Sequence, residues 1–491
     1  MTPFVLAIDI GTTSTKVLAV SSEGQVLKSH QCFYPTHYPK SGFAEQDPQQ
    51  IFNAVLEGIS VTMKDISADY QIAAICFSSA MHGLMAVDKD GEPLTPLIIW
   101  ADTRSSEQAA RLRNTEPGKR LHDQTGTAIH PMSPLCKLLW WKEHEPKLFQ
   151  NAYKFISIKD YVVFHLSGEY LIDYSLASAT GLFDIELLRW SEEALGLIGI
   201  STERLSKPVS VYCKVFIKPN VRSISSDLLG VPIFLGASDG CLSQLGSNAM
   251  DQGALTITVG TSGAVRRVGS KETKDPERKL FRYLLDEDTL IIGGATNNGT
   301  VILDWFAREF FSTPMSLGEL TKLVSEIPAG SEGLIALPFL QGERAPMYNP
   351  DARGVFFNIS LRHTRAHFIK ALMEGVCFEL RSIVKSVETA CGPSKKVLVS
   401  GGFTHAPEWV QVLSNILGKE LIVSGTHDAS AMGAAQIAFR SLNLSFQSNQ
   451  SHQITFTPDD SLWELYNNRF EAFESLYVQL ESQFGLIFYK D

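Results

Sequence analysis

Two short turns rich in glycine and hydroxyl side chains constrain this chain most strongly. The first, Gly11 to Ser14, lies between the apolar runs 4–10 and 16–20, which predicts a β-hairpin. The second, Gly260 to Gly263, follows residues 255–259, where apolar side chains alternate with threonine as in a strand. Because one such strand and turn occurs in each half of the chain, the pattern predicts a duplicated domain.

Strand and helix patterns alternate along the rest of the chain, which is typical of an α/β protein. Because a domain typically has roughly 150 residues, a chain of 491 residues is expected to form two or three domains. We place the boundary so that residues 1–236 form the N-terminal domain and residues 237–491 the C-terminal domain. The predicted strands are 72–77, 231–236 and 397–400, and the predicted helices are 48–56, 241–245, 407–417, 431–439 and a closing helix after 459.

Charge and hydrophobicity exclude several classes of protein. The hydrophobic share of 44% and charged share of 20% fit a water-soluble globular chain. The net charge of −10 disfavours nucleic acid or an anionic membrane as the main partner, so an anionic ligand needs a local cationic pocket. The first residues lack a basic segment, and no run reaches the ~18 apolar residues of a membrane span, so we expect a cytoplasmic protein.

The cysteines argue against a disulfide framework. There are seven, an odd number, and they form neither a CxxC pair nor a spaced Cys/His tetrad. Neither a disulfide scaffold nor a structural zinc site is therefore expected.

The residues of the two turns suit a magnesium-bound polyphosphate. Asp9 ends the first strand, where its carboxylate can face the metal, and the hydroxyls, amides and lysine that follow can meet phosphate oxygens. A threonine-rich turn with a solvated lysine explains the first turn equally well; the second turn favours a nucleotide held between two domains. The candidate phosphate-binding residues are Thr12, Thr13, Ser14, Lys16, Gly260 and Thr261. A P-loop is excluded, because Gly418-Lys419 is followed by Glu420.

Asp239 follows a predicted buried strand and precedes a helix. In isolation this position favours an N-cap, with a general base at a domain cleft as the alternative. In phosphoryl transfer to a hydroxyl, an aspartate need only orient the alcohol and accept its proton late, so an ordinary pKa suffices.

Polar side chains also follow the predicted strand 72–77, and residues 98–104 place further polar groups at the end of another strand. Open α/β sheets bind ligands at strand ends. Taken alone, His82 fits a core residue, and Asp102 with Arg104 fits a surface ion pair. The placement of both segments at strand ends favours a polyol pocket instead. We expect Trp100 to form a stacking wall and His82, Asp102 and Arg104 to supply hydrogen bonds.

Gly401-Gly402 offers a flat surface for an adenine ring or, equally, a site of tight packing.

The ordered set of motifs resembles the FGGY family of carbohydrate kinases over nearly the whole chain. It includes 9–13, Met81-His82-Gly83, Trp100-Ala101-Asp102, Asp239, 260–263, 337–346 and Gly401-Gly402, together with two signature stretches at 132–140 and 358–374. Trp141 and Asn358 depart from the family pattern, which has an aliphatic residue and a glycine there, and we expect local packing changes. The resemblance implies two actin-like (ribonuclease H-like) ATPase domains with a cleft between them.

Several residue roles follow from the resemblance alone. Asp239 matches the catalytic base, Asp9 matches the aspartate near magnesium, and both are candidate metal ligands. Met81 and His82 match sugar contacts. Gly299, Gly401 and Gly402 fall where the family approaches the nucleotide, and Ala406 stands where some relatives use a polar residue. The implied cofactors are ATP and Mg²⁺.

The stretches 125–135, 78–82 and 100–105 are similar to the gluconokinase branch, which implies phosphorylation of D-gluconate to 6-phospho-D-gluconate. A pocket for this sugar acid needs a cation, and Arg104, Lys137, His82 and His130 are the candidates. The alternatives are a xylulokinase or another pentulose or polyol kinase and, remotely, an actin- or Hsp70-like ATPase. The expected partner is a small sugar or sugar acid, and self-association as a homodimer stays open.

Overall fold

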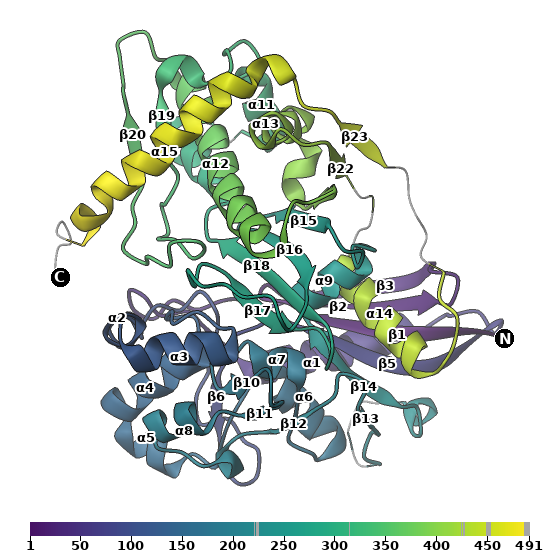
Figure 1. Cartoon of the computed structure of the whole chain (residues 1–491). Helices are drawn as coiled ribbons and strands as arrows, with labels where there is room; N and C mark the ends of the chain where they lie inside the picture. The colour runs from purple at the N-terminus through teal and green to yellow at the C-terminus, as the bar shows by residue number, and fades with distance from the viewer. Residues whose placement is uncertain are drawn as a thin grey trace.

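The computed structural model describes residues 1–219, 221, 225–313, 315–423, 425, 428–447 and 453–485. Figure 1 shows two lobes, each built around a mixed β-sheet with helices packed on it. The α/β architecture with two similar domains is therefore confirmed. No helix of the described part of the chain is both long and apolar enough to cross a membrane.

The sheet of the first lobe begins with the predicted hairpin. β1 pairs antiparallel with β2, so that Ile10 lies opposite Thr15 across the turn. β5 runs parallel to β1, and β14 runs parallel to β5. The six strands lie in the order β13 (Lys214–Val215), β14 (Ile233–Ser238), β5 (Tyr70–Ser79), β1 (Thr2–Ile10), β2 (Ser14–Ser21) and β3 (Val26–Phe33).

The sheet of the second lobe repeats this plan. Its antiparallel strands β15, β16 and β18 correspond to β1, β2 and β3, and its parallel strands β21 and β22 correspond to β5 and β14. The duplication predicted from the two turns is thus present in the strand order. The seven strands are β17 (Phe281–Leu284), β18 (Leu290–Thr296), β16 (Gly263–Gly269), β15 (Ala254–Val259), β21 (Lys396–Ser400), β22 (Leu421–Val423) and β23 (Ile454–Phe456).

The helices of the first lobe cover its sheet and also form an extension beside it, which has its own core built mainly from α2 to α5, α7 and α8. Asp47 caps α1 through the amides of Gln49 and Gln50, and the buried face of α1 packs on β2 and β3. The helices are α1 (Pro48–Met63), α2 (Ser106–Arg113), α3 (Glu116–Thr125), α4 (Pro134–His144), α5 (Pro146–Asn151), α6 (Ile158–Ser167), α7 (Tyr174–Ser178) and α8 (Glu192–Ile198).

Short two-stranded ladders complete the first lobe. β7 pairs with β4, and its Ile98 also forms an antiparallel bridge with Leu84, so β7 lies outside the six-stranded sheet. The prediction that Trp100 follows a strand of the central sheet is therefore wrong; the strand is two residues long and belongs to a small ladder. The short strands are β4 (Glu45–Gln46), β6 (Met85–Val87), β7 (Leu97–Ile98), β8 (Lys154–Ile156), β9 (Leu171–Asp173), β10 (Phe183–Asp184), β11 (Arg189–Trp190) and β12 (Lys207–Val209).

A long central helix, α12, supports the sheet of the second lobe by packing on β16 and β18. Pro407 at the first turn of α13 and left-handed Gly418 after it bound the helix as predicted. The elements are α9 (Asp239–Gly246), α10 (Val301–Phe310), α11 (Leu317–Leu323), α12 (Arg365–Cys391), α13 (Pro407–Leu417), α14 (Ala429–Ser441), α15 (Trp463–Phe484), β19 (Ile335–Leu337) and β20 (Val355–Phe357).

Two helices, α9 and α14, join the lobes. α14 follows the second-lobe strand β22 but packs on β1, β5 and β14 of the first-lobe sheet, beside α9 (Figure 1). Glycines permit this crossing: a Cβ at Gly246 would stand 1.9 Å from the Ala429 carbonyl oxygen, and one at Gly433 would stand 2.2 Å from that of Leu242. The predicted boundary after residue 236 falls inside β14 and stays a prediction.

Candidate active site

A cavity of about 240 Å³ lies between the lobes and brings the two predicted turns together. Thr12 reaches it from the first turn, and Ser262 and Gly263 reach it from the second. Asp239, at the start of α9, lines the same cavity. One crevice is therefore shared by both turns and the candidate base.

The first turn is held by contacts from distant segments. The Tyr34 hydroxyl donates to the carbonyl oxygen of Gly11 at 2.7 Å, and the Trp100 Nε1 donates to the hydroxyl of Thr12 at 2.9 Å. Thr13 is exposed, whereas Ser14 accepts a hydrogen bond from the side chain of Gln31. The hydroxyls of Thr13 and Ser14 are thus not held by hydrogen bonds to the interior of the protein.

Asp9 lies at the end of β1 with both carboxylate oxygens occupied. Oδ1 accepts from the Ser78 hydroxyl and Oδ2 from the Ser430 hydroxyl, each at 2.7 Å. Burial raises the pKa of Asp9 above its ordinary value, and the charge of Asp428 adds to the effect, although the two hydroxyls and Lys16 oppose it. Carboxylates that repel one another in this way suit a divalent cation.

Lys16 contacts the beginning of α14. Its Nζ lies 2.6 Å from Oδ2 of Asp428, with both side chains partly exposed. Asp428 and Ser430 could not be found from the sequence, because both are more than 400 residues from their partners, Lys16 and Asp9, on the strands beside the first turn. Only the return of α14 to the first-lobe sheet brings them there.

The second turn packs against the backbone at Gly299. The amide of Gly299 donates to the carbonyl oxygen of Thr261, and the amide of Thr300 donates to that of Gly260. A Cβ at Gly299 would stand 2.3 Å from the Gly260 carbonyl oxygen, so a side chain cannot be accommodated. The glycine at 299 therefore fixes the conformation of the turn.

Gly401 and Gly402 differ in their surroundings. Gly401 has a φ of +99°, and a Cβ there would stand 2.4 Å from the carbonyl oxygen of Val259, at the strand end that precedes the second turn. A Cβ at Gly402 would meet no atom within 4 Å. Gly401 thus permits close packing, whereas Gly402 offers open, exposed backbone. Ala406 is fully buried, which separates it from any ligand surface.

Asp239 is the first residue of α9, and Ser238 rather than Asp239 is the N-cap, so the prediction that Asp239 caps this helix is wrong. Its Oδ1 accepts from the Gly240 amide at 2.6 Å. Burial raises the pKa of Asp239 to about 6, the charge of Asp9 adds to the rise, and Arg266 opposes it. The carboxyl therefore titrates close to neutral pH.

Met81, His82 and Trp100 line the cavity from the first lobe. His82 Nδ1 lies 2.7 Å from the carbonyl oxygen of Ala179, and its ring packs edge-on against Tyr283. Burial, with the charges of Lys137 and Arg344, lowers the pKa of His82 to about 3, so the imidazole is neutral. His82 can exchange hydrogen bonds with a ligand but cannot neutralise an anion.

Asp102 and Arg104 contact each other rather than the cavity. The fully buried Asp102 carboxylate accepts from the backbone amides of Ala44 and Arg104 and from the Arg104 guanidinium. The guanidinium also pairs with Glu45 at 2.6 Å and stacks on Phe43. Neither residue lines the cavity that holds Asp239; a contact with substrate stays a prediction.

The other two cations expected near a sugar acid have different surroundings. Lys137 is buried, and its Nζ donates to the carbonyl oxygens of His82, Ile98 and Ile99, which ties together the two segments that carry His82 and Trp100. Burial and the charge of Arg113 lower the pKa of His130 well below its ordinary value. Neither side chain provides an available positive charge.

Two arginines that the sequence did not single out line the cavity instead. The Arg344 guanidinium lies over the ring of Trp100, 4.8 Å from its centre, and donates to the carbonyl oxygen of Thr296. Arg266, on β16, lies next to Gly240 beside the candidate base, since a Cβ at Gly240 would stand 3.2 Å from its Nε. The Nε of each arginine is buried and has no hydrogen-bond partner. Arg344 belongs to the conspicuous stretch 337–346, so its motif was visible although its role was not.

The two departures from the family signatures fit their positions. Asn358 adopts a left-handed φ of 68°, which asparagine tolerates almost as readily as glycine, and its side chain donates to the carbonyl oxygen of Gly333. Trp141 is buried in the core of the first-lobe extension, stacked on Phe155.

Comparisons with known proteins agree with this architecture. The gluconokinase of Bacillus subtilis (strain 168) is 39% identical over 447 residues, covering 88% of this chain and 86% of that protein. The xylulose kinase of the same strain is 30% identical over 487 residues, covering 97% of each chain. The crystal structure of gluconate kinase from Lactobacillus acidophilus superposes with a TM-score of 0.93 at 31% identity, covering 99% of this chain and 100% of that one.

Two family models account for most of the chain. The N-terminal domain of the FGGY family of carbohydrate kinases matches residues 4–246, and the C-terminal domain matches residues 255–442. Their order and extent agree with the two lobes and the cavity between them, and the chain belongs to the FGGY family of carbohydrate kinases.

Proposed function

We propose that this protein transfers the γ-phosphoryl group of ATP to D-gluconate and forms 6-phospho-D-gluconate. The observation that carries the substrate assignment is the pair of arginines, Arg266 and Arg344, at the wall of the cavity that contains Asp239. Each has an unpartnered, buried Nε, which is a costly arrangement unless a ligand supplies an acceptor. A carboxylate at one end of the sugar supplies it, with the charge-assisted geometry that arginine favours.

The relatives support the same assignment. Two gluconokinases of Bacillus are 38% and 39% identical to this chain, whereas the xylulose kinases of Bacillus subtilis and Lactococcus lactis are 30% and 31% identical. Because a pocket for a neutral ketose has no need of two buried arginines whose Nε atoms lack an acceptor, the two arginines also favour a sugar acid. Xylulose or another pentulose or polyol is the alternative substrate. Membership of a carbohydrate kinase family argues against the remote alternative, an actin- or Hsp70-like ATPase.

In the proposed reaction, Asp239 orients the attacking hydroxyl. Its Oδ1 is held by the Gly240 amide, which leaves Oδ2 to accept the hydroxyl proton. With a pKa of about 6, the carboxyl is mainly ionised at pH 7 and is a somewhat stronger base than an exposed aspartate. The oxygen of the sugar forms the new bond to the γ-phosphorus, the bond to the β,γ-bridging oxygen breaks, and ADP leaves.

The two turns hold the nucleotide phosphates. We assign phosphate contacts to Thr12, Thr13, Ser14, Lys16, Gly260 and Thr261, and nucleotide contacts to Gly299, Gly401 and Gly402. Exposed hydroxyls and open backbone at Thr13 and Gly402 suit this role. Of the substrate contacts, Met81, His82 and Trp100 line the cavity, whereas Asp102 and Arg104 support it from outside.

A magnesium ion fits beside Asp9. Asp9 and Asp428 repel each other, as do Asp9 and Asp239, and carboxylate oxygens are the donors that Mg²⁺ prefers. Asp9 would hold the ion, directly or through water, with Asp239 nearby; the ion would neutralise phosphate charge. A cytoplasmic location and a homodimer remain predictions from the sequence.

Product-identified turnover with D-gluconate, D-xylulose, D-ribulose and glycerol tests the proposal. We expect ATP consumption and a sugar phosphate mainly with D-gluconate. A higher kcat/KM for an uncharged sugar would refute the gluconate assignment, and ATP hydrolysis without any sugar phosphate would refute the kinase assignment.

A further inference from the structure

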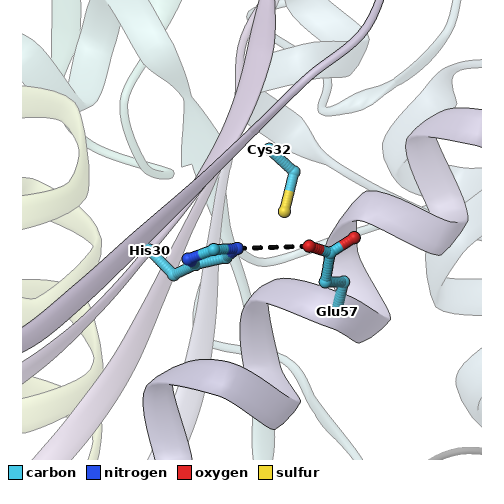
Figure 2. Close-up of side chains that lie close together, drawn as sticks. All are labelled: His30, Cys32 and Glu57. Carbon is cyan, nitrogen blue, oxygen red and sulfur yellow. Dashed lines mark hydrogen bonds and ion pairs between the residues drawn. The ribbon is translucent and has the colours of Figure 1, made fainter.

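An edge strand and a helix of the first lobe bring together three side chains that commonly bind metal ions. His30 and Cys32 are two residues apart on β3 and so point to the same face of the strand. Glu57 projects from α1, which packs on that face. Figure 2 shows the three side chains directed toward one another. Their potential ligand atoms all lie within 4.8 Å of one another.

The spacing is close to that of a tetrahedral site. His30 Nε2 lies 3.3 Å from Oε1 of Glu57. In a tetrahedron with metal–nitrogen and metal–oxygen bonds of about 2.0–2.1 Å, two such ligands are about 3.3 Å apart. The imidazole and carboxylate are thus already spaced as zinc requires, and the thiol must move toward them. His30 and Cys32 are only partly buried and Glu57 is exposed, so the side chains have room to adjust.

The types of donor select among ions. A thiolate and an imidazole favour zinc and related transition metals over Mg²⁺, which prefers oxygen ligands and octahedral geometry. One thiolate and one carboxylate also neutralise a divalent ion. Without an ion, burial and the charge of Glu57 raise the pKa of Cys32 to about 11, so metal binding releases the thiol proton to solvent.

We infer that His30, Cys32 and Glu57 form a binding site for one zinc-type ion at the edge of the first-lobe sheet, with the fourth position open to water. The ligands are Nε2 of His30, Sγ of Cys32 and the carboxylate of Glu57. This site is separate from the carboxylate site at Asp9, which suits Mg²⁺. The three residues form neither a CxxC pair nor a Cys/His tetrad, and for this reason the cysteine pattern of the sequence argued against a structural zinc site.

The position of the site gives the ion a structural role. β3 is the outer strand of its sheet, and no further strand among the described residues covers its edge. A metal ion bound by β3 and α1 would join this edge strand to the helix that packs on it. β3 ends just before Tyr34, whose hydroxyl holds the first turn through Gly11. We therefore expect zinc to raise the thermal stability of the protein.

The test is metal binding by the full chain, first freed of metal with a chelator. Excess Mg²⁺ is present so that the carboxylates near Asp9 are occupied. Zinc binding is measured by equilibrium dialysis, and Co²⁺ replaces zinc to detect the absorption that a cobalt–thiolate bond produces. The variants are Cys32→Ser and Glu57→Ala, and the matched control is Cys213→Ser, which removes another half-buried free cysteine.

We expect one equivalent of zinc per chain, a cobalt–thiolate band, and a rise in melting temperature on adding zinc. Cys32→Ser should abolish the band and weaken zinc binding at least tenfold, and Glu57→Ala should weaken binding at least tenfold, whereas Cys213→Ser should change neither. Absence of a cobalt–thiolate band, or zinc binding unchanged in Cys32→Ser, overturns the inference. If Cys32→Ser does not fold, the exposed position of Glu57 makes Glu57→Ala decisive, and unchanged binding in that variant also overturns it.

Discussion

Replacing Asp239 with asparagine should make the protein more stable while removing most of its activity. Burial raises the pKa of the Asp239 carboxyl from 3.8 to about 6 in the folded protein. At 1.36 kcal/mol per unit, the ionised side chain costs about 3 kcal/mol of folding free energy at pH 7. An asparagine keeps the acceptor for the Gly240 amide and carries no charge. Burying the asparagine amide costs about 1–2 kcal/mol, so we expect the free energy of unfolding at pH 7 to rise by about 1–2 kcal/mol.

The sign of the pH dependence follows from the direction of the shift. Because the folded pKa lies above the unfolded one, the favourable contribution of Asp239 is fully present below about pH 3.8 and is lost as the pH rises through about 6. At pH 4.5 the cost of the carboxylate has fallen to about 1 kcal/mol. The advantage of Asp239→Asn over the natural sequence should therefore be largest at pH 7 and nearly vanish at pH 4.5.

Urea unfolding at both pH values, without ligands and with divalent ions chelated, measures this difference. Exposed Asp288→Asn is the matched control and should show no such pH-dependent gain. Turnover of Asp239→Asn should fall by about two to four decades. A variant no more stable than the natural sequence at pH 7, or an equal advantage at both pH values, would refute the electrostatic reasoning; near-normal turnover would remove Asp239 from the mechanism.

Three further predictions concern the cavity and the helices that join the lobes. kcat/KM should decrease about tenfold per pH unit below about pH 6, as Asp239 becomes protonated, and a flat profile from pH 7 to 5 would contradict this. Arg344→Gln should lower kcat/KM for gluconate by about two to three decades but affect an uncharged sugar much less; equal losses would show that Arg344 does not bind the carboxylate. Gly433→Ala should cost about 1–3 kcal/mol in a denaturation experiment, since its Cβ would meet the carbonyl oxygen of Leu242. The control Gly196→Ala, with nothing within 4 Å of its Cβ, should be neutral or stabilising, and equal effects of the two substitutions would contradict the packing argument.

The sequence predicts the framework of the fold because its signals are local. Alternating strands, the turns at Gly11 and Gly260, and the start and end of the helix at 407–417 are all readable within about ten residues. Their repetition in both halves predicted the duplicated sheets, which the strand order confirms. The exception was the segment before Trp100, where a short apolar run belongs to a two-residue ladder rather than the central sheet.

The candidate site was predictable only in part, because its contacts depend on how the lobes meet. Thr12, Asp239 and Ser262 follow strands, so their convergence could be expected. Asp428, by contrast, reaches Lys16 only because α14 crosses to the other lobe. Charge alone was also misleading, because the cations expected near the sugar are paired, buried or neutral. Arg344 could be distinguished only by its position at the cavity wall, above the ring of Trp100.

The crossing of α14 bears on how this chain can be divided or recombined. Residues 1–246 produced alone would carry a sheet whose face lacks the helix that covers it, and exposed apolar surface of that kind promotes aggregation. A chimera that exchanges first lobes between two kinases would need to bring residues 429–441 from the same parent, because these residues pack on β1, β5 and β14. The smallest exchangeable unit is thus discontinuous in the gene, although each lobe looks like a separate module in the amino-acid order.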